Sequence, residues 1–220
     1  MFMKYIISFI GLCLLTSLAG AQQPEMPSGE PVTVGTRYTI SSKTLAQDRE
    51  ILVALPEGYE GSQIQYPVVY MTEGQWFFAY TADMMARLAS SSAMPPAILV
   101  ATKMASPSRF SWLQAGTPKA DQFLDFIEQD VISFVEENFR TNKQRTLVGW
   151  EFGGGFAIHA LQTRPQLFDA YIASSPFPVN DQDLTFAALR DLSAQRPETK
   201  KFLYFGGAEF EGMVREGIDR

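Results

Sequence analysis

Two kinds of hydrophobic pattern follow one another along the chain, and they predict strands and helices in turn. Residues 36–42 and 50–55 alternate between apolar and polar positions, which is typical of half-buried strands. The short linker between them favours an antiparallel pair. Further along, short continuous apolar runs indicate strands that are buried on both faces. These runs cover residues 67–71, 97–101, 146–149, 170–173 and 202–205.

Segments with helical spacing lie between these runs. The clearest covers residues 119–139, where Phe123, Ile127 and Val131 lie on one apolar stripe. Further helices are predicted over residues 77–88, 154–163 and, more weakly, 184–193. Strand and helix alternate from residue 66 onward, so the sequence predicts an α/β fold: one doubly wound, mostly parallel sheet with an N-terminal antiparallel hairpin. In such a sheet, functional residues gather at the carboxyl ends of the strands.

The first residues have the pattern of a secretory signal peptide. Lys4 precedes an apolar run over residues 5–18, and Ala19 and Ala21 are the small residues that a signal peptidase reads. We therefore expect a signal peptide over residues 1–21, a flexible lead-in over 22–34 and one domain over 35–220. The protein would be periplasmic or secreted, with no membrane span after cleavage.

The composition argues against several classes of chemistry. The single cysteine, Cys13, lies in the predicted signal peptide, so the mature domain would have no disulfide and no thiolate metal site. The formal net charge is −6 and no run of Lys or Arg stands out, which argues against a nucleic-acid partner. Four glutamates could meet at the strand ends, but with one histidine and no Asp-rich loop we predict no metal and no cofactor. They are Glu73, Glu151, Glu209 and Glu211.

The most informative motif is the turn Gly149-Trp150-Glu151-Phe152-Gly153 between a predicted strand and a predicted helix. It has the G-x-S-x-G spacing of a hydrolase nucleophile elbow, but a glutamate stands where serine is required. The aromatic residues near this turn are most often core residues, although some could line an apolar binding pocket.

The order of several segments resembles the putative-esterase family of α/β hydrolases, in the branch of esterase D and the enterochelin-type esterases. The segments are TRYTISS, LPEGYEGSQIQYPVVYMTEGQWFF, ADQFLDFIEQDVISFVEENFRT, RTLVGWEFGGGFAIHAL and RPQLFDAYIASSPF. The resemblance implies an α/β-hydrolase fold, here with an incomplete C-terminal part, and ester hydrolysis by a serine, a histidine and an acid.

By motif match, the resemblance assigns three parts of a site. The oxyanion turn is Glu73 with Gly74 and Gln75, next to Trp76, and the triad acid is Glu209 or Glu211. The elbow is Glu151, flanked by Trp150 and Phe152.

Two departures from the family pattern put this chemistry in doubt. Attack on an ester by the Glu151 carboxylate would give an anhydride, so Glu151 is a poor replacement for serine. The single histidine, His159, lies about 12 Å along a helix from the elbow, too far to act on Glu151. We expect His159 to face neighbouring side chains or solvent. We expect Glu151 to hydrogen-bond the amides of its own oxyanion hole and seal the site.

Two hypotheses follow. The first is a pseudoenzyme of esterase descent that binds a small ester-like ligand or a protein partner without turning it over. The alternative is an active carboxylic-ester hydrolase that uses Glu151 and a histidine supplied from sequence beyond this chain.

Overall fold

A computed structural model describes residues 28–104, 108–176 and 202–206. The chain separates into a unit over Met1–Val32 and a unit over Thr33–Arg220, and the fold is that of the second unit. Residues 28–35 are exposed and have no regular secondary structure. The predicted signal peptide and the predicted helix over 184–193 lie outside the described residues.

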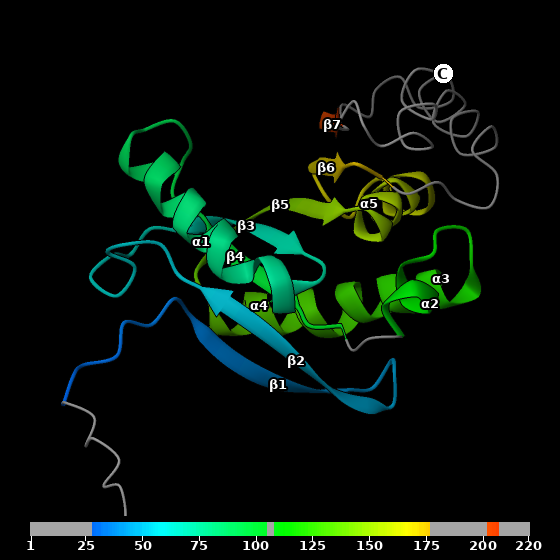
Figure 1. The fold of residues 1–220 in the computed structure, drawn as a ribbon, viewed down its shortest axis with the longest axis horizontal. Helices are drawn as coiled ribbons and strands as arrows, with labels where there is room; N and C mark the ends of the chain where they lie inside the picture. The colour runs from blue at the N-terminus through cyan, green and yellow to red at the C-terminus, as the bar shows by residue number, and fades with distance from the viewer. Residues whose placement is uncertain (1–27, 105–107, 177–201, 207–220) are drawn as a thin grey trace, which may run out of the picture. The chain divides into compact units, whose positions relative to one another are not determined.

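The described strands form one seven-stranded sheet in the order β1-β2-β4-β3-β5-β6-β7 (Figure 1). Strands β1 and β2 are antiparallel, as is the β2–β4 pair, whereas β4, β3, β5, β6 and β7 are mutually parallel. This confirms the predicted mostly parallel sheet with an antiparallel hairpin. The strands are β1 (Thr36–Ser42), β2 (Gln47–Ala54), β3 (Tyr66–Met71), β4 (Ile98–Thr102), β5 (Thr141–Trp150), β6 (Ala170–Ser174) and β7 (Phe202–Gly206).

Helices cover both faces of the sheet, and each face has its own apolar core. Helix α1 packs on one face, where Met71 and Leu99 meet Phe78 and Met85. The other helices belong to the larger core on the opposite face, which also holds Tyr70 of β3. The helices are α1 (Gly74–Ser90), α2 (Ser108–Leu113), α3 (Pro118–Phe126), the π-helical η1 (Ile127–Ile132), α4 (Ser133–Asn138) and α5 (Phe152–Thr163).

The predicted long helix over 119–139 is continuous but contains a π-helical segment. Thr117 caps its start by accepting a hydrogen bond from the Ala120 N–H, and Pro118 follows at the first helical position. Within η1, the Asp130 carboxylate accepts hydrogen bonds from the Ser42 hydroxyl (2.5 Å) and the Thr44 N–H (3.3 Å). The helix is thereby tied to the hairpin of β1 and β2.

Two elements differ most from the sequence-based prediction. Strand β5 begins at Thr141, five residues before the predicted start, because its polar first residues pair with β3 across a register shift between Tyr66 and Val68. Helix α2 was not predicted, since six residues are too few to show a helical period.

Candidate functional site

The elbow predicted from the motif is present at the carboxyl end of β5. Glu151 joins β5 to α5 with φ 51° and ψ −114°, a conformation that non-glycine residues rarely adopt. Its N–H donates to the Ser174 carbonyl and its carbonyl accepts from the Gly155 N–H, both at 3.0 Å. A Cβ atom on Gly149 would lie 1.9 Å from the Gly153 carbonyl oxygen, so the turn requires glycine there. The strand–turn–helix geometry of a nucleophile elbow is therefore kept around a glutamate.

A second strained glutamate lies at the carboxyl end of β3. Glu73 precedes α1 in the left-handed region, with φ 61° and ψ 37°, and it is completely buried. Its carboxylate lies against the first turn of α5, because a Cβ atom on Gly153 would be 3.1 Å from Glu73 Oε2. The turn assigned to the oxyanion hole and the elbow therefore lie side by side.

Arg109 of α2 joins the two glutamates, and the sequence analysis missed it. Its Nε lies 2.5 Å from Glu73 Oε1, and its Nη2 donates a hydrogen bond to Glu151 Oε2 at 2.8 Å. The Arg109 side chain is 10% exposed and that of Glu73 is 1% exposed, whereas that of Glu151 is 30% exposed. Residues from three separate connections thus form one buried cluster of charges.

The charges of this cluster do not cancel. Two carboxylates share one guanidinium, so the net charge is −1 when both glutamates are ionised. Glu73 Oε1 and Arg109 Nε make a close ion pair, and the backbone N–H of Gly153 adds a contact that favours the ionised carboxylate. Burial raises the pKa of Glu73 to about 7, and the negative charge of Glu151 adds to this, although the Arg109 charge opposes both.

The family of the chain follows from its sequence and agrees with this geometry. The profile of the family described as "Putative esterase" matches residues 42–199. The chain belongs to this family. It has the α/β-hydrolase fold and lies in the enterochelin-esterase-like branch, as the resemblance implied.

Similar proteins are named as siderophore esterases. The chain is 35% identical over 146 residues to the siderophore triacetylfusarinine C esterase of Aspergillus fumigatus, a match that covers 57% of this chain and 50% of that protein. It is 47% identical over 70 residues to the siderophore enterobactin esterase of Emericella nidulans, covering 28% of this chain and 23% of that one. The chain thus spans half or less of the length of these relatives.

A solved structure supports the fold. The BES protein from Bacillus cereus aligns with a TM-score of 0.76 at 22% identity, over 90% of this chain and 84% of that one. At this identity the likeness concerns the fold alone.

The prediction that Glu151 hydrogen-bonds the backbone amides beside it is wrong for the amides of α5. The Glu151 side chain makes no capping hydrogen bond to the amides of α5. It binds the Arg109 guanidinium instead, since a charge-assisted hydrogen bond to a cation is stronger than one to a neutral amide. The signal that could have revealed Arg109 is indirect: two glutamates at neighbouring strand ends need a cation when they are buried.

Aromatic rings surround the guanidinium. Its central carbon lies 4.9 Å from the ring centroids of Trp76 and Phe110 and 5.5 Å from that of Phe152. Trp76 and Phe110 are about half exposed, so they also present apolar surface to solvent. Trp150 belongs to the other face of the sheet, where it packs on Phe77 with ring centroids 5.4 Å apart.

Other predicted residues have simpler positions. Gly74 is buried, and a Cβ atom there would lie 2.7 Å from the Ala101 Cβ. Gln75 Oε1 accepts a hydrogen bond from the Met104 N–H at 2.9 Å, which ties the oxyanion turn to the loop after β4. Glu209 and Glu211, the predicted triad acids, lie outside the described residues.

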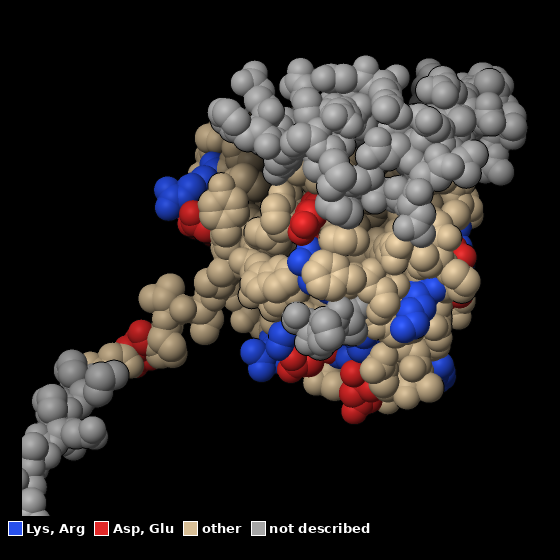
Figure 2. Space-filling view, turned by 45° about the vertical axis from the view of Figure 1, so that its right-hand side comes forward, with Lys and Arg blue, Asp and Glu red and all other residues tan. Residues whose placement is uncertain are grey.

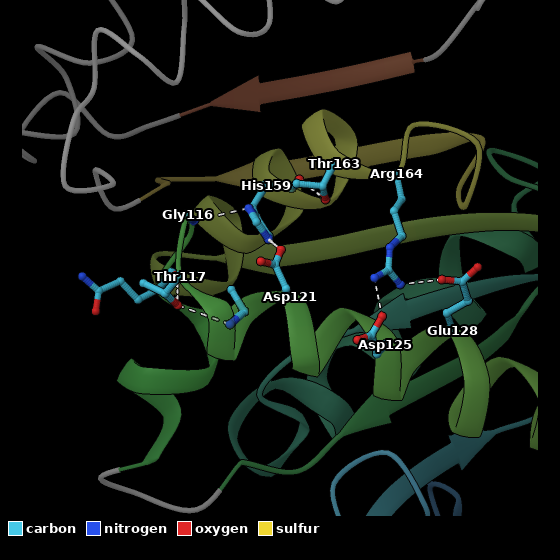
Figure 3. Close-up of polar contacts among 10 residues, drawn as sticks. Gly116, Thr117, Asp121, Asp125, Glu128, His159, Thr163 and Arg164 are labelled. Carbon is cyan, nitrogen blue, oxygen red and sulfur yellow. Dashed lines mark hydrogen bonds and ion pairs between the residues drawn. The ribbon is translucent and has the colours of Figure 1, made fainter.

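The single histidine is engaged in a separate polar cluster between α5 and α3 (Figure 3). His159 Nδ1 accepts from the Gly116 N–H at 3.3 Å, so in the neutral ring Nε2 carries the proton toward Asp121 Oδ1, 3.0 Å away. Burial lowers the pKa of His159, although Asp121 opposes this shift. The prediction that His159 faces neighbouring side chains rather than Glu151 is confirmed.

Charged side chains on the surface are mixed. On the face shown in Figure 2, acidic and basic residues are interspersed in small groups among uncharged ones. Within residues 28–104, 108–176 and 202–206, no group of three or more His, Cys, Asp and Glu side chains is placed to hold a metal ion. In the same part of the chain, none of the helices has the length and apolar character needed to cross a membrane.

Proposed function

We propose that this esterase-family protein binds an ester-like ligand at the carboxyl ends of β3 and β5 and does not hydrolyse it. The observation that carries the proposal is the state of Glu151. It occupies the position of the nucleophile, and its carboxylate is held by Arg109 at 2.8 Å. A carboxylate paired with a guanidinium is a weaker nucleophile than a free one, and its attack on an ester would give an anhydride that needs a further hydrolysis.

The position of the single histidine supports the same proposal. Hydrolysis of an acyl intermediate requires a group that takes a proton from water, most often histidine. The sequence has one histidine, and both ring nitrogens of His159 are engaged by Gly116 and Asp121. Movement of that ring toward the elbow would break both contacts.

We infer the ligand class from the relatives and the setting from the N-terminal sequence. The named substrates of the relatives are siderophores, so a siderophore ester is the first ligand to test. The half-exposed rings of Trp76 and Phe110 offer flat apolar surfaces to such a ligand. Export to the periplasm or the medium, with cleavage after Ala21, would bring the protein to siderophores outside the cytoplasm.

An active ester hydrolase is the second candidate, and two observations favour it. The strained backbone of Glu151 is the conformation that presents a nucleophile at the elbow, and strain of this kind is most common at functional sites. Glu73, with a pKa of about 7, could exchange a proton there near neutral pH. In this second candidate, a histidine from sequence beyond this chain would act together with Glu151.

The experiment is to mix the mature protein with enterobactin or triacetylfusarinine C. Binding is followed by quenching of tryptophan fluorescence, to which Trp76 contributes, and products are followed by mass spectrometry. We expect saturable quenching with no hydrolysed product. Product that forms with the wild type and not with Glu151→Gln would overturn the non-catalytic function. If neither compound bound and neither gave a product, the proposed ligand class would be wrong.

A further inference from the structure

The two carboxylates that share Arg109 are not equivalent. Glu73 is completely buried and cannot leave without exposing a core position, whereas the Glu151 side chain is 30% exposed to solvent. Glu151 is therefore the partner that a solute can reach and replace.

We propose that Arg109 is the anion-binding centre of this site and that Glu151 occupies it in place of a ligand carboxylate. The ligand class is a monocarboxylate with an aromatic or other flat apolar body. This inference deepens the proposed function and takes from it only the idea that the site holds a ligand at the carboxyl ends of β3 and β5.

The guanidinium has the capacity for such a ligand. Arginine carries five N–H donors in a planar fork that matches a carboxylate, and Arg109 uses Nε toward Glu73 and Nη2 toward Glu151. The ion pair of Arg109 with Glu73 is neutral as a unit when Glu73 is ionised. When a ligand carboxylate displaces Glu151, the Nη2 donor of Arg109 is already held in position by the contact of Nε with Glu73. The guanidinium is also already largely buried, so the ligand does not have to desolvate it.

The surroundings of Arg109 suit the body of the ligand. Trp76, Phe110 and Phe152 lie around the guanidinium, and the first two are about half exposed. An aromatic acid could place its carboxylate on Arg109 and its ring against these side chains. Hydrolysis of an ester releases a carboxylic acid, so an anion centre at the elbow of an esterase fold lies where the acid part of such a compound belongs.

The inference explains why Glu151 does not cap α5. Its carboxylate lies at the start of the helix, yet it contacts Arg109 and makes no capping hydrogen bond. The Glu151 carboxylate, which is part of the chain, competes with any carboxylate in solution for the Arg109 guanidinium. Binding to the wild type is then weakened in proportion to how well Glu151 holds its place.

The test uses benzoate as the probe and the uncharged benzamide as its matched control, with isothermal titration calorimetry on the full chain. Three proteins are compared: the wild type, Glu151→Ala and Glu151→Gln. We expect Glu151→Ala to bind benzoate at least about tenfold more tightly than the wild type, because it removes the competitor and opens space. Glu151→Gln should lie between them, and benzamide should bind no variant better than the wild type.

Two further variants assign the binding to Arg109. In the Glu151→Ala background, Arg109→Lys keeps the charge and loses the planar fork, and we expect benzoate affinity to fall about tenfold. Arg109→Met alone could unfold the protein by leaving Glu73 without a cation. It is therefore combined with Glu73→Gln and Glu151→Ala, and this neutral triple variant should not bind benzoate.

Three outcomes would overturn the inference: equal benzoate affinity in the wild type and a folded Glu151→Ala, equal binding of benzamide and benzoate, or retained binding in the neutral triple variant. The result is separate from the fate of the proposed function. Ester turnover by the wild type would refute the non-catalytic role without changing the benzoate titration. A failed benzoate titration would refute the anion-binding role of Arg109 without giving the protein esterase activity.

Discussion

Two polar clusters lie at the two ends of helix α5, and they are built in opposite ways. At its start, Glu151 joins Glu73 and Arg109 in a cluster with two residues at positive φ and a buried carboxylate. At its end, His159 binds Gly116 and Asp121, and Arg164 binds Asp125 and Glu128.

The cluster of His159 and Arg164 stabilises the fold, whereas the cluster of Glu73, Arg109 and Glu151 costs free energy that the rest of the fold has to offset. Figure 3 shows the second cluster as direct contacts between α5 and the helix opposite it, and its acidic members are partly exposed. The first cluster combines a desolvated charge with backbone strain, both of which cost free energy. Features of that kind persist where a binding or reacting group has to be held in place.

Removal of the shared cation should have the largest effect. Arg109→Met leaves two carboxylates close together, one of them buried, and we expect a loss of about 3–5 kcal/mol in the free energy of unfolding. Arg164→Met is the matched change at the other end of α5 and should cost about 1 kcal/mol, since its acidic partners are partly exposed. Urea unfolding followed by circular dichroism measures both. Equal losses would remove the distinction between the clusters.

The pH dependence of stability should come next in size. The pKa of Glu73 is about 7 in the folded chain and near 4.5 when unfolded, so between these values the folded state binds the extra proton. Stability from this group is present below pH 4.5 and is lost as the pH rises through 7. The total is on the order of 3 kcal/mol.

The measurement for Glu73 is the difference in unfolding free energy between the wild type and Glu73→Gln across this range. The amide has no proton to release, so the difference should change steadily from pH 4.5 to 7. A constant difference would show that the carboxyl group titrates normally and would contradict the cost assigned to its burial.

The histidine cluster should respond in the opposite direction. The pKa of His159 is lowered by burial, so its stabilising contribution is present above the unfolded value near 6.5 and is lost as the pH falls through the folded value. His159→Gln should therefore flatten the acid side of the stability profile. At neutral pH it should cost about 1–2 kcal/mol through its altered contacts with Gly116 and Asp121. A steeper acid loss in the variant than in the wild type would contradict this role.

The smallest expected effect isolates the strain at the elbow. Glu151→Ala and Glu151→Gly both lose the carboxylate, but only glycine adopts a φ of 51° without steric cost. We expect Glu151→Gly to be more stable than Glu151→Ala by about 1 kcal/mol. Thermal unfolding of the two variants side by side measures it, and an alanine variant as stable as the glycine variant would mean that the turn is unstrained.

Much of this arrangement could be predicted from the sequence, because strands buried on both faces and strongly amphipathic helices leave clear patterns. The apolar runs of β3, β4 and β6 were located to within a residue or two, and the glycine spacing located the elbow at Glu151. The first residues of β5 are polar and gave no such signal. Its true start depends on pairing with β3, which lies far away in sequence.

Arg109 could not be predicted because its role is set by tertiary contact. It lies 36 residues from Glu73 and 42 residues from Glu151 in sequence, on a helix too short to show a period. Nothing near Arg109 in sequence marks it as a partner of either glutamate. The resulting error was the assumption that Glu151 would turn to the nearest amides, when the fold provides a stronger partner.

The most direct test of the central claim is the initial rate of hydrolysis of p-nitrophenyl acetate and p-nitrophenyl butyrate by the mature protein, with Glu151→Gln and Glu151→Ser measured in parallel. If Glu151 is bound to Arg109 and does not act on esters, all three proteins should hydrolyse both esters no faster than buffer without protein does. Turnover by the wild type that disappears in Glu151→Gln would contradict the account, because Glu151 would then be a catalytic carboxylate.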